Sequence, residues 1–383
     1  MNEDRSFHIG PIRPPSEAAS LLLQVTRGCT WNKCRFCNLY RDTRFRAYSA
    51  EEVKRDIDVI AAYAEEVRGY SFDGQWDLDG LNGRLGSIRD DEQRQCFYMV
   101  AQWLLNGGEN VFLQDGNTTA LSSGRLSDVL IYLKQTFPQI RRITSYGRAE
   151  ELSRHDAGYF AELKEAGLDR IHSGFETGSD RVLEMIHKGT TSDHEITAGK
   201  NIRAGGIELS IYFMPGIGGR ELSAENAEGT ARVVNEVEPD FIRIRTGAVK
   251  PGTELYEDYR QGLFSLCSDD DKVREIRTVI ELTPGARTRL VSDHMVNLLQ
   301  ELEGCLSLEK DRRRMLAQID RYQELEEADR RVYQLLRRTL RAYDLDDMER
   351  LSDGERQQLR EAVMEDPARR WDEKMNGYIS RYI

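Results

Sequence analysis

The sequence predicts an α/β protein whose main domain is a partial (β/α)6 barrel, followed by helices. Six short apolar runs alternate with amphipathic segments between Leu21 and about Leu255, and each run ends in polar residues or glycine. The first of these runs, Leu21–Val25, suits a buried parallel strand, and the alternation with helical segments is typical of an α/β domain. Because six repeats do not complete an eight-stranded barrel, we expect an open barrel whose lateral gap admits a substrate larger than a metabolite.

Composition places the chain among large proteins with a highly charged surface. Its 383 residues suit one large domain with an appendage, and 39% of them are hydrophobic while 31% are charged. The net charge of −12 argues against a general nucleic-acid binder, so we expect no DNA partner. No apolar run approaches the roughly 20 residues of a membrane span and no signal pattern opens the chain, so we expect a cytoplasmic protein without membrane contact.

Three segments are expected along the chain. A proline-rich arm covers residues 1–17, the barrel covers 18–260, and a helical domain covers 261–383. Within the barrel, residues 66–90 carry five glycines among aspartates and arginines, and we expect a long insertion loop there. Two interpretations of that loop stay open, a mobile surface excursion and a lid over the substrate pocket.

The first repeat has the clearest signals. Leu21–Val25 is a continuous apolar run, a cysteine-rich loop follows it, and Ser49 opens a capping signature that predicts the next helix. Glycines and Pro138 then separate the remaining elements. The further strands are expected at Val111–Leu113, Ile140–Ser145, Leu168–Ser173, Ile207–Phe213 and Phe241–Thr246, and the barrel helices at residues 91–106, 127–137, 159–167 and 193–204.

The region after the barrel is expected to form helices with mixed-sign charge. One helix is expected over Lys272–Leu282 and another over Ser292–Leu302, with Ser292 as the N-terminal cap of the second. A long amphipathic pattern then covers Leu308–Leu340. We interpret its many arginines as the solvated face of a helical bundle that covers the flank of the barrel.

Half of the six cysteines lie within nine residues, at Cys29, Cys34 and Cys37. Three thiolates on one loop can bind a single inorganic centre and leave its fourth coordination position open, as a catalytic centre requires. The alternative is a structural zinc whose shell is completed by a distant cysteine or histidine, although no second Cys-x-x-Cys or His-x-x-x-His pattern is present. The other three cysteines lie far apart and are interpreted as buried thiols.

This loop, in which the aromatic residue Phe36 directly precedes the third cysteine, resembles the cluster loop of radical S-adenosylmethionine enzymes. In that superfamily three thiolates hold a 4Fe-4S cluster, and the fourth iron is chelated by the amino and carboxylate groups of S-adenosylmethionine. The usual spacing is three residues and then two, whereas this chain has four and then two. The difference concerns loop geometry and subfamily, and the resemblance implies both cofactors.

The resemblance also implies cofactor-binding residues at the carboxyl ends of the strands. After the second expected strand, Gln114, Asp115 and Gly116 occupy the place of a motif that contacts the methionine amine, and Asp115 supplies a carboxylate. The sequence differs there from the Gly-Gly-Glu pattern of the family, and an ordinary turn is the alternative. Ser145 and Arg148 stand at the corresponding place after the third expected strand.

A second motif follows the fourth expected strand. The run that begins Gly174-Phe175-Glu176 resembles the Glu-Ser/Thr-Gly-Ser-Asp stretch of the branch that includes the methylthiotransferases and the Elongator catalytic subunit, a branch to which oxygen-independent coproporphyrinogen oxidase is also similar. The resemblance implies that Glu176 binds the nucleoside or methionine part of the cofactor, and a helix-capping carboxylate is a compatible interpretation. It also places adenine-contacting main chain at the turn formed by Met214, Pro215 and Gly216.

Strand parity predicts residues that face the substrate. Alternate side chains of a barrel strand point inward, so Tyr212, Arg243 and Arg245 are expected to line the interior, with an arginine available to pair a carboxylate of the substrate or cofactor. The alternative is an internal ion pair with an acidic residue of the barrel. His294 is a further candidate for a pocket residue, and an ordinary surface or core histidine is the alternative. Tyr212, Arg245 and His294 are therefore the catalytic candidates.

The resemblance implies reductive cleavage of S-adenosylmethionine, after which a 5′-deoxyadenosyl radical removes hydrogen from the substrate. It implies a reductant such as flavodoxin or ferredoxin as a partner. The substrate stays open between a small molecule, a peptide and an RNA. Two other classes of function also stay open, a zinc-stabilised binding module and a non-catalytic protein with a degenerate barrel.

Overall fold

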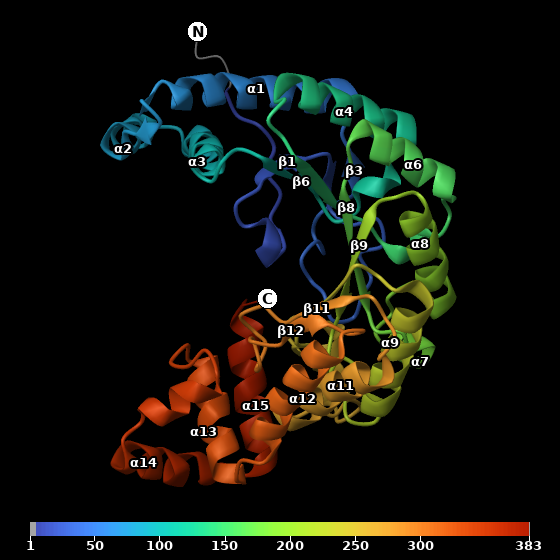
Figure 1. Cartoon of the computed structure of the whole chain (residues 1–383), viewed down its shortest axis with the longest axis vertical. Coiled ribbons are helices and arrows are strands. Elements are labelled where there is room, and N and C mark those ends of the chain that lie inside the picture. Colours follow the sequence, from blue (N-terminus) through green and yellow to red (C-terminus); the bar gives the residue numbers. More distant parts are fainter. Residues whose placement is uncertain (1–4, 383) are drawn as a thin grey trace. The chain divides into compact units, whose positions relative to one another are not determined.

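One sheet of eight strands is the centre of the fold in the computed structural model, which describes residues 5–382 (Figure 1). Neighbouring strands run parallel from β1 to β8 and from β9 to β11, and β12 is antiparallel to β11. This confirms the expected α/β class and the open, barrel-like succession of strands. In spatial order the strands are β1 Leu21–Gln24, β6 Asn110–Gln114, β7 Arg142–Tyr146, β8 Arg170–Glu176, β9 Glu208–Phe213, β10 Phe241–Ile244, β11 Arg289–Val291 and β12 Glu303–Cys305.

The register brings the ends of neighbouring strands to one edge of the sheet. Gln24, the last residue of β1, lies opposite Gln114, the last residue of β6. Both strands are buried along their apolar residues, as continuous Leu, Val and Phe runs predict. The residues that follow the two strands therefore leave the sheet side by side, and these residues include the start of the cysteine loop and Asp115.

The chain forms two compact units, and each is described by itself. The first consists of residues 5–30, 40–173 and 201–209, and the second consists of residues 31–39, 174–200 and 210–382. The cysteine loop thus contributes Cys29 to the first unit, and Cys34 and Cys37 to the second.

Helices of the first unit cover its strands. α1 begins at a capping box in which Ser49 and Glu52 exchange hydrogen bonds, and it buries apolar residues at helical spacing, such as Val53, Ile57 and Ile60. α1 packs against α3 and α4, and α4 packs against α6 (Figure 1). The helices are α1 Ala50–Arg68, α2 Leu78–Ser87, α3 Asp91–Leu105, α4 Ser123–Thr136, α5 Ala149–Leu152 and α6 Ala157–Ala166. α8 Ser192–Ala204 belongs partly to each unit.

The second unit contains the remaining helices. α9 packs against α11, and α13 packs against α14 and α15. α11 begins at a capping box formed by Ser268 and Asp271, and its extent agrees closely with the predicted helix Lys272–Leu282. The helices are α7 Asp180–Met185, α9 Ser223–Val237, α10 Glu254–Arg260, α11 Asp269–Leu282, α12 Glu309–Gln323, α13 Glu327–Arg338, α14 Asp353–Met364 and α15 Ala368–Ile379.

The prediction of a long insertion loop over residues 66–90 is wrong. α1 continues to Arg68, the short strands β4 Ser71–Phe72 and β5 Gln75–Trp76 form a hairpin, and α2 follows. The hairpin turns at Asp73 and Gly74, which both have positive φ, as a two-residue hairpin turn requires. Asp77 caps α2 by accepting a hydrogen bond from the Gly80 amide (2.9 Å). Of the five glycines that suggested a loop, three lie within α2, Gly74 lies in the hairpin turn and Gly69 directly follows α1.

The region beyond residue 260 differs from prediction in two places. The helix expected over Ser292–Leu302 is absent from the described structure, where β11 and β12 extend the sheet and an irregular segment joins them, so Ser292 caps no helix. The pattern over Leu308–Leu340 forms two helices, α12 and α13, with a break at residues 324–326. Of the expected terminal segments, residues 1–4 and 383 lie outside the described residues.

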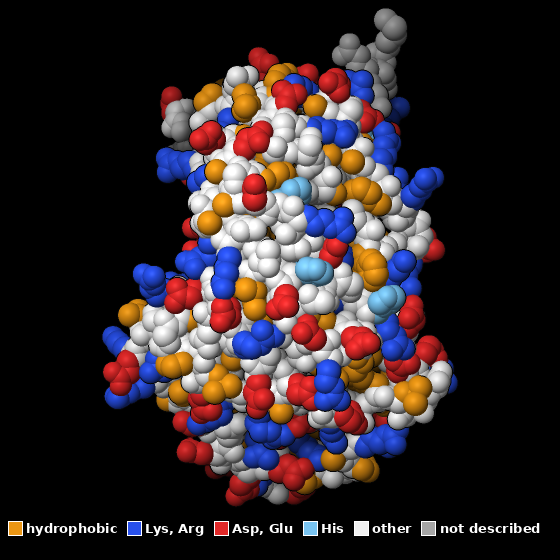
Figure 2. Space-filling view, turned by 90° about the vertical axis from the view of Figure 1, so that its right-hand side faces the viewer, with side chains coloured by type: hydrophobic (Ala, Val, Ile, Leu, Met, Phe, Trp, Pro, Cys, Tyr) orange, Lys and Arg blue, Asp and Glu red, His pale blue; other side chains and the backbone are white. Residues whose placement is uncertain are grey.

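Acidic and basic side chains are interspersed over the face that Figure 2 shows, with small apolar areas between them. This distribution agrees with a chain in which 31% of the residues are charged. Among residues 5–382, no helix is both long and apolar enough to cross a membrane.

Candidate active site

Asp115, directly after β6, is the centre of a hydrogen-bond network in the first unit. Its buried carboxylate accepts hydrogen bonds from the Tyr40 hydroxyl, from the Gly28 amide (3.4 Å) and from the Gln24 side-chain amide (3.3 Å). Burial raises the pKa of Asp115 to about 6, and these donors oppose the rise. Gly28 and Tyr40 flank the cysteine loop in sequence, so Asp115 fixes the first-unit ends of that loop.

Gly116 permits close packing between the end of β6 and the cysteine loop. A Cβ atom at this position would lie 2.9 Å from the Gly28 carbonyl oxygen and 3.5 Å from the Cys29 Cα atom. Gly28 itself has φ +82°, a conformation that side-chain-bearing residues rarely adopt. The two glycines therefore form a close cradle at Cys29, which a larger residue would occupy.

Arg148 lies beside Cys29, as a donor to its sulfur. Its Nη1 atom is 3.9 Å from the Cys29 Sγ atom, and its Nε atom donates to Glu151 (3.0 Å). Glu151 in turn accepts a hydrogen bond from the Thr30 hydroxyl (2.5 Å). A cationic donor next to a sulfur suits a cluster ligand, because hydrogen bonds to the sulfurs tune such centres.

The side chains of Gln114 and Ser145 form hydrogen bonds with other groups of the protein. The Gln114 side chain accepts from the Gly10 amide (2.7 Å) and donates to the Ile12 carbonyl (2.5 Å), so it holds the arm against β6. The buried Ser145 hydroxyl contacts Thr118 and the Tyr146 carbonyl (3.1 Å). A cofactor role for either residue stays a prediction that these contacts do not support.

The second unit holds its part of the cysteine loop by backbone hydrogen bonds. The Arg35 amide donates to the Ile186 carbonyl (2.9 Å), and the Arg35 carbonyl accepts from the Leu255 amide (2.9 Å). The Cys37 amide donates to the Cys34 carbonyl (3.2 Å) and closes a turn between these two cysteines. The loop is therefore anchored between the end of α7 and the start of α10.

Phe36 and Met214, which are far apart in sequence, meet in one apolar cluster of the second unit. Phe36 packs against the buried core that contains Met214, Ile186 and Leu255. The Lys188 ammonium lies 5.7 Å from the centroid of the Phe36 ring. The structure thus brings the aromatic residue of the cysteine loop together with the turn after β9.

Glu176 ends β8 with a positive φ of 68°. Its carboxylate is paired with the Lys188 ammonium (2.8 Å), and both side chains are largely buried. Its carbonyl accepts a hydrogen bond from the Met214 amide (2.8 Å), which joins the ends of β8 and β9. The Glu176 side chain is therefore held in place at the strand ends by Lys188, a residue to which the sequence analysis assigned no role.

The turn after β9 is held by Glu275 of α11. Its carboxylate accepts hydrogen bonds from the Gly216 amide (2.8 Å), the Asn226 side-chain amide (2.7 Å) and the Ser223 hydroxyl (2.6 Å). Burial raises the pKa of Glu275 to about 7. Gly216 has φ +85°, and a Cβ atom there would lie 2.9 Å from the Lys272 side chain. No local sequence pattern marks Glu275, because it lies 59 residues after the turn that it holds.

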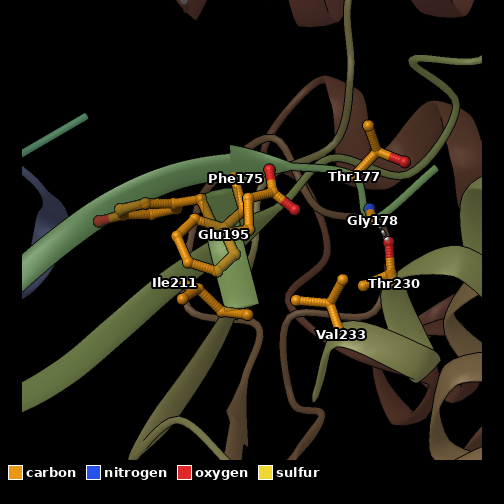
Figure 3. Close-up of a pocket in the computed structure, with 8 residues that line it drawn as sticks. Phe175, Thr177, Gly178, Glu195, Ile211, Thr230 and Val233 are labelled. Carbon is orange, nitrogen blue, oxygen red and sulfur yellow. Dashed lines mark hydrogen bonds between the residues drawn. The ribbon is translucent and has the colours of Figure 1, made fainter. Parts of the chain in front are cut away.

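Tyr212 is buried and lines a small space between β8, β9, α8 and α9. Figure 3 shows Glu195 among Phe175, Ile211 and Val233, with the Gly178 amide donating to the Thr230 hydroxyl (3.1 Å) nearby. Neither carboxyl oxygen of Glu195 has a hydrogen-bond partner in the described structure. Burial raises the pKa of Glu195 well above its usual range, and the charges of Glu176 and Asp180 add to the rise.

Arg243 and Arg245 have different surroundings, although parity places them on the same side of the chain. Arg243 is buried and donates to the Ser210 hydroxyl (3.2 Å) and to the carboxylate of Asp293 (3.0 Å). Asp293 is an exposed residue beyond the predicted barrel, so this ion pair differs from the internal pair with a barrel residue that was the alternative. Arg245 is partly exposed, and its Nε atom is buried without a hydrogen-bond partner among the described residues. His294 lies close enough for the Arg245 charge to lower the pKa of its imidazole.

The described residues contain no group of three or more His, Cys, Asp or Glu side chains arranged to hold one metal ion. A 4Fe-4S cluster makes a different demand, because each thiolate ligates a different iron and the sulfurs need not converge on one point. All six cysteines are thiols rather than disulfides. The glycine cradle at Cys29 and the Arg148 donor fit a sulfur-bound cluster ligand.

The family described as the Radical SAM superfamily matches residues 79–227 of this chain. This part of the chain is a radical S-adenosylmethionine domain. The matched residues contain β6, β7, β8 and β9, and with them Asp115, Arg148, Glu176 and the turn at Gly216. Enzymes of this superfamily use a 4Fe-4S cluster and S-adenosylmethionine.

Curated relatives of the chain carry different names. A protein of Pyrococcus horikoshii, named an uncharacterized methyltransferase, is 27% identical over 238 residues, which are 62% of this chain and 41% of that protein. The tRNA-2-methylthio-N(6)-dimethylallyladenosine synthase of Prosthecochloris aestuarii is 25% identical over 280 residues, 72% of this chain and 52% of that protein. The chain therefore spans about half, or less, of the length of these relatives.

A solved structure of coproporphyrinogen III oxidase (HemN) from Escherichia coli, titled a radical SAM enzyme, is also similar. The two chains share 14% sequence identity, and the TM-score is 0.42. The aligned part covers 70% of this chain and 52% of the oxidase chain.

Proposed function

We propose that the protein binds a 4Fe-4S cluster through Cys29, Cys34 and Cys37 and cleaves S-adenosylmethionine reductively. When bound, the cluster and S-adenosylmethionine supply the electron transfer and the 5′-deoxyadenosyl radical that abstracts hydrogen from a substrate. The observation that carries the proposal is the anchoring of Cys29 at the carboxyl end of β6, where Asp115 fixes the loop and Arg148 donates to the sulfur. Chemistry at the carboxyl ends of parallel strands is the rule for barrel enzymes.

The chain's own residues would bind and position the cofactor. Glu275 fixes the turn at Gly216, and the main chain of this turn would contact the adenine. Glu176, held by Lys188, presents a carboxylate at the end of β8 that can accept hydrogen bonds from hydroxyl or amino groups. Phe36 and Met214 exclude water from the space beside this turn.

The partners and the compartment belong to the same proposal. A reductant such as flavodoxin or ferredoxin would supply the electron, and the clustered thiols suit the reducing environment of the cytoplasm. The relatives with different named reactions belong to one superfamily, so residues outside the cofactor motifs would select a small-molecule, peptide or RNA substrate.

Anaerobic reconstitution followed by incubation with a reductant tests the proposal. We expect about four irons per chain, broad absorption at about 400 nm, and 5′-deoxyadenosine with methionine as products of S-adenosylmethionine. Alanine at Cys29, Cys34 or Cys37 should abolish iron binding and 5′-deoxyadenosine formation together.

Cys305→Ala provides the matched control, because this partly exposed cysteine lies outside the loop and should leave both properties intact. A full cluster in any one of the three loop variants would refute the assignment of the ligands. A zinc content of one per chain without iron would favour the binding-module alternative.

A further inference from the structure

Arg245, directly after β10, has no anionic partner among the described residues. Arg243, two residues earlier, is neutralised by Asp293 and also donates to Ser210. By contrast, no acidic side chain among residues 5–382 forms an ion pair with Arg245. Its Nε atom is buried without an acceptor from these residues. A partly buried guanidinium without a counter-charge is unfavourable unless something else supplies the acceptor.

His294 presents a second donor next to Arg245. Its Nδ1 atom accepts a hydrogen bond from the Val296 amide (3.2 Å), so the proton of the neutral ring is on Nε2, which makes no hydrogen bond to any residue that the structure describes. Burial, together with the nearby charge of Arg245, lowers the pKa of His294 to about 4. At neutral pH the ring is therefore an uncharged donor beside a cationic one.

Hydrogen bonds from two other parts of the chain hold the segment that carries His294. Asn297 donates to the Ile244 carbonyl (2.7 Å) and accepts from the Thr246 amide (2.9 Å), which clamps the segment to the end of β10 on both sides of Arg245. Arg337 of α13 donates to the carbonyls of Asn297 (2.8 Å) and Leu298 (3.0 Å). The two donors are thus pre-organised before any ligand arrives.

We propose that Arg245 and His294 form a binding site for an anionic group, a carboxylate or a phosphate, of a molecule bound at the carboxyl end of β10. A guanidinium offers two parallel N–H groups to such an anion, and the His294 Nε2–H adds a third donor. The proposed function supplies two sources for the anion, the acid group of a substrate and the carboxylate of S-adenosylmethionine, and to that extent the inference rests on it.

Equilibrium dialysis with radiolabelled inorganic phosphate tests the site in the full-length chain, at constant ionic strength. Arg245→Gln should weaken phosphate binding about tenfold or more, because it removes a charge-assisted hydrogen bond. His294→Phe should weaken it by a smaller factor. Arg245→Lys keeps the charge but loses the paired donors, and should give an intermediate affinity, which guards against a Gln variant that fails to fold.

Two further variants make the prediction specific to this pair. Asp293→Asn removes the counter-charge of Arg243 and should tighten phosphate binding, since a second guanidinium then becomes available. Arg287→Gln is the matched control, because this arginine is 79% exposed and 3.8 Å from Glu238, and its loss should leave phosphate binding unchanged. Equal phosphate affinity in wild type, Arg245→Gln and His294→Phe would overturn the proposal, as would an equal loss in Arg287→Gln.

Binding of S-adenosylmethionine to the reconstituted enzyme then assigns the source of the anion. If Arg245→Gln lowers that affinity as well, the site takes the carboxylate of the cofactor; if it leaves the affinity unchanged, the site takes an acid group of the substrate. Both results support an anion site. Phosphate binding needs neither a cluster nor turnover, so a failure of this site is distinguishable from a failure of the proposed function.

Discussion

Replacing Glu195 with methionine should stabilise the protein. The Glu195 side chain is fully buried among Phe175, Ile211 and Val233, and neither carboxyl oxygen has a hydrogen-bond partner (Figure 3). The space beside it is too small to hold a water molecule that would provide one. Burying an unsatisfied polar group costs about 1–3 kcal/mol, and methionine fills a similar volume without polar atoms. We therefore expect Glu195→Met to raise the free energy of unfolding by about 1–3 kcal/mol at about pH 4.5, where the wild-type carboxyl group is largely protonated in both states.

The pH dependence gives this prediction a sign. Burial raises the pKa of Glu195 well above its ordinary value in the folded state, so the folded chain keeps a proton that the unfolded chain loses above pH 4.5. Wild-type stability should thus fall as pH rises from about 4.5 towards the raised pKa, by about 1.4 kcal/mol per pH unit for this group. Glu195→Met lacks this loss, so its advantage over wild type should grow with pH.

Urea denaturation followed by circular dichroism at pH 5.5 and 7.5 measures both effects. Glu228→Met is the matched control, because Glu228 is an exposed glutamate of α9, and its replacement should change stability by less than about 0.5 kcal/mol at both pH values. The reasoning is refuted if Glu195→Met destabilises the protein, or if its difference from wild type is the same at both pH values.

Three further outcomes follow from the hydrogen bonds and close contacts of the site. Gly116→Ala should lower the iron content after reconstitution, because the new Cβ atom would lie 2.9 Å from the Gly28 carbonyl oxygen. Gly83→Ala is the control: a Cβ atom there has no neighbour within 4 Å, so this variant should retain iron and stabilise α2 by about 0.5–1 kcal/mol. Tyr40→Phe removes a donor to the buried Asp115 carboxylate and should cost about 1.5–3 kcal/mol in urea denaturation, whereas Tyr98→Phe, at a half-exposed position, should cost almost nothing. Glu275→Gln should weaken S-adenosylmethionine binding in calorimetry without loss of iron, because the Gly216 amide loses a carboxylate acceptor; unchanged affinity would show that Glu275 does not position the turn.

The strands could be predicted from local sequence because each is a short segment with apolar residues that is followed by polar residues or glycine. Leu21–Gln24 and Asn110–Gln114 lie within a residue or two of the predicted bounds. The segment Ser292–Leu302 misled the prediction, because its buried residues Val296, Leu299 and Leu302 have helical spacing. Its carbonyls are instead satisfied by Arg337 and Arg338, about 40 residues later, and no local window contains such partners.

Site residues could be predicted where they belong to a sequence motif. They could be predicted less well where their role depends on a hydrogen-bond or ion-pair partner that is distant in sequence. The roles of Cys29, Cys34 and Cys37 stay predictions, but Arg148 does lie beside Cys29. Strand parity grouped Arg243 with Arg245, yet it could not show that Asp293 neutralises only the first of them. Charge balance around a side chain is a property of the assembled fold, and it decides which arginine can accept a ligand.

The arginines of α13 imply that the C-terminal helices are not a detachable module. Arg337 donates to three backbone carbonyls, and Arg338 donates to a fourth and pairs with the buried Asp269 (2.8 Å). A chain that was shortened before α13 would keep every strand of the sheet. It would lack the arginines that donate to the carbonyls of the segment that carries His294. Insertions and recombination should therefore be tolerated at exposed turns such as Asp73-Gly74, whereas exchange of the C-terminal helices between relatives would succeed only if β10, the segment after β11 and α13 were exchanged together.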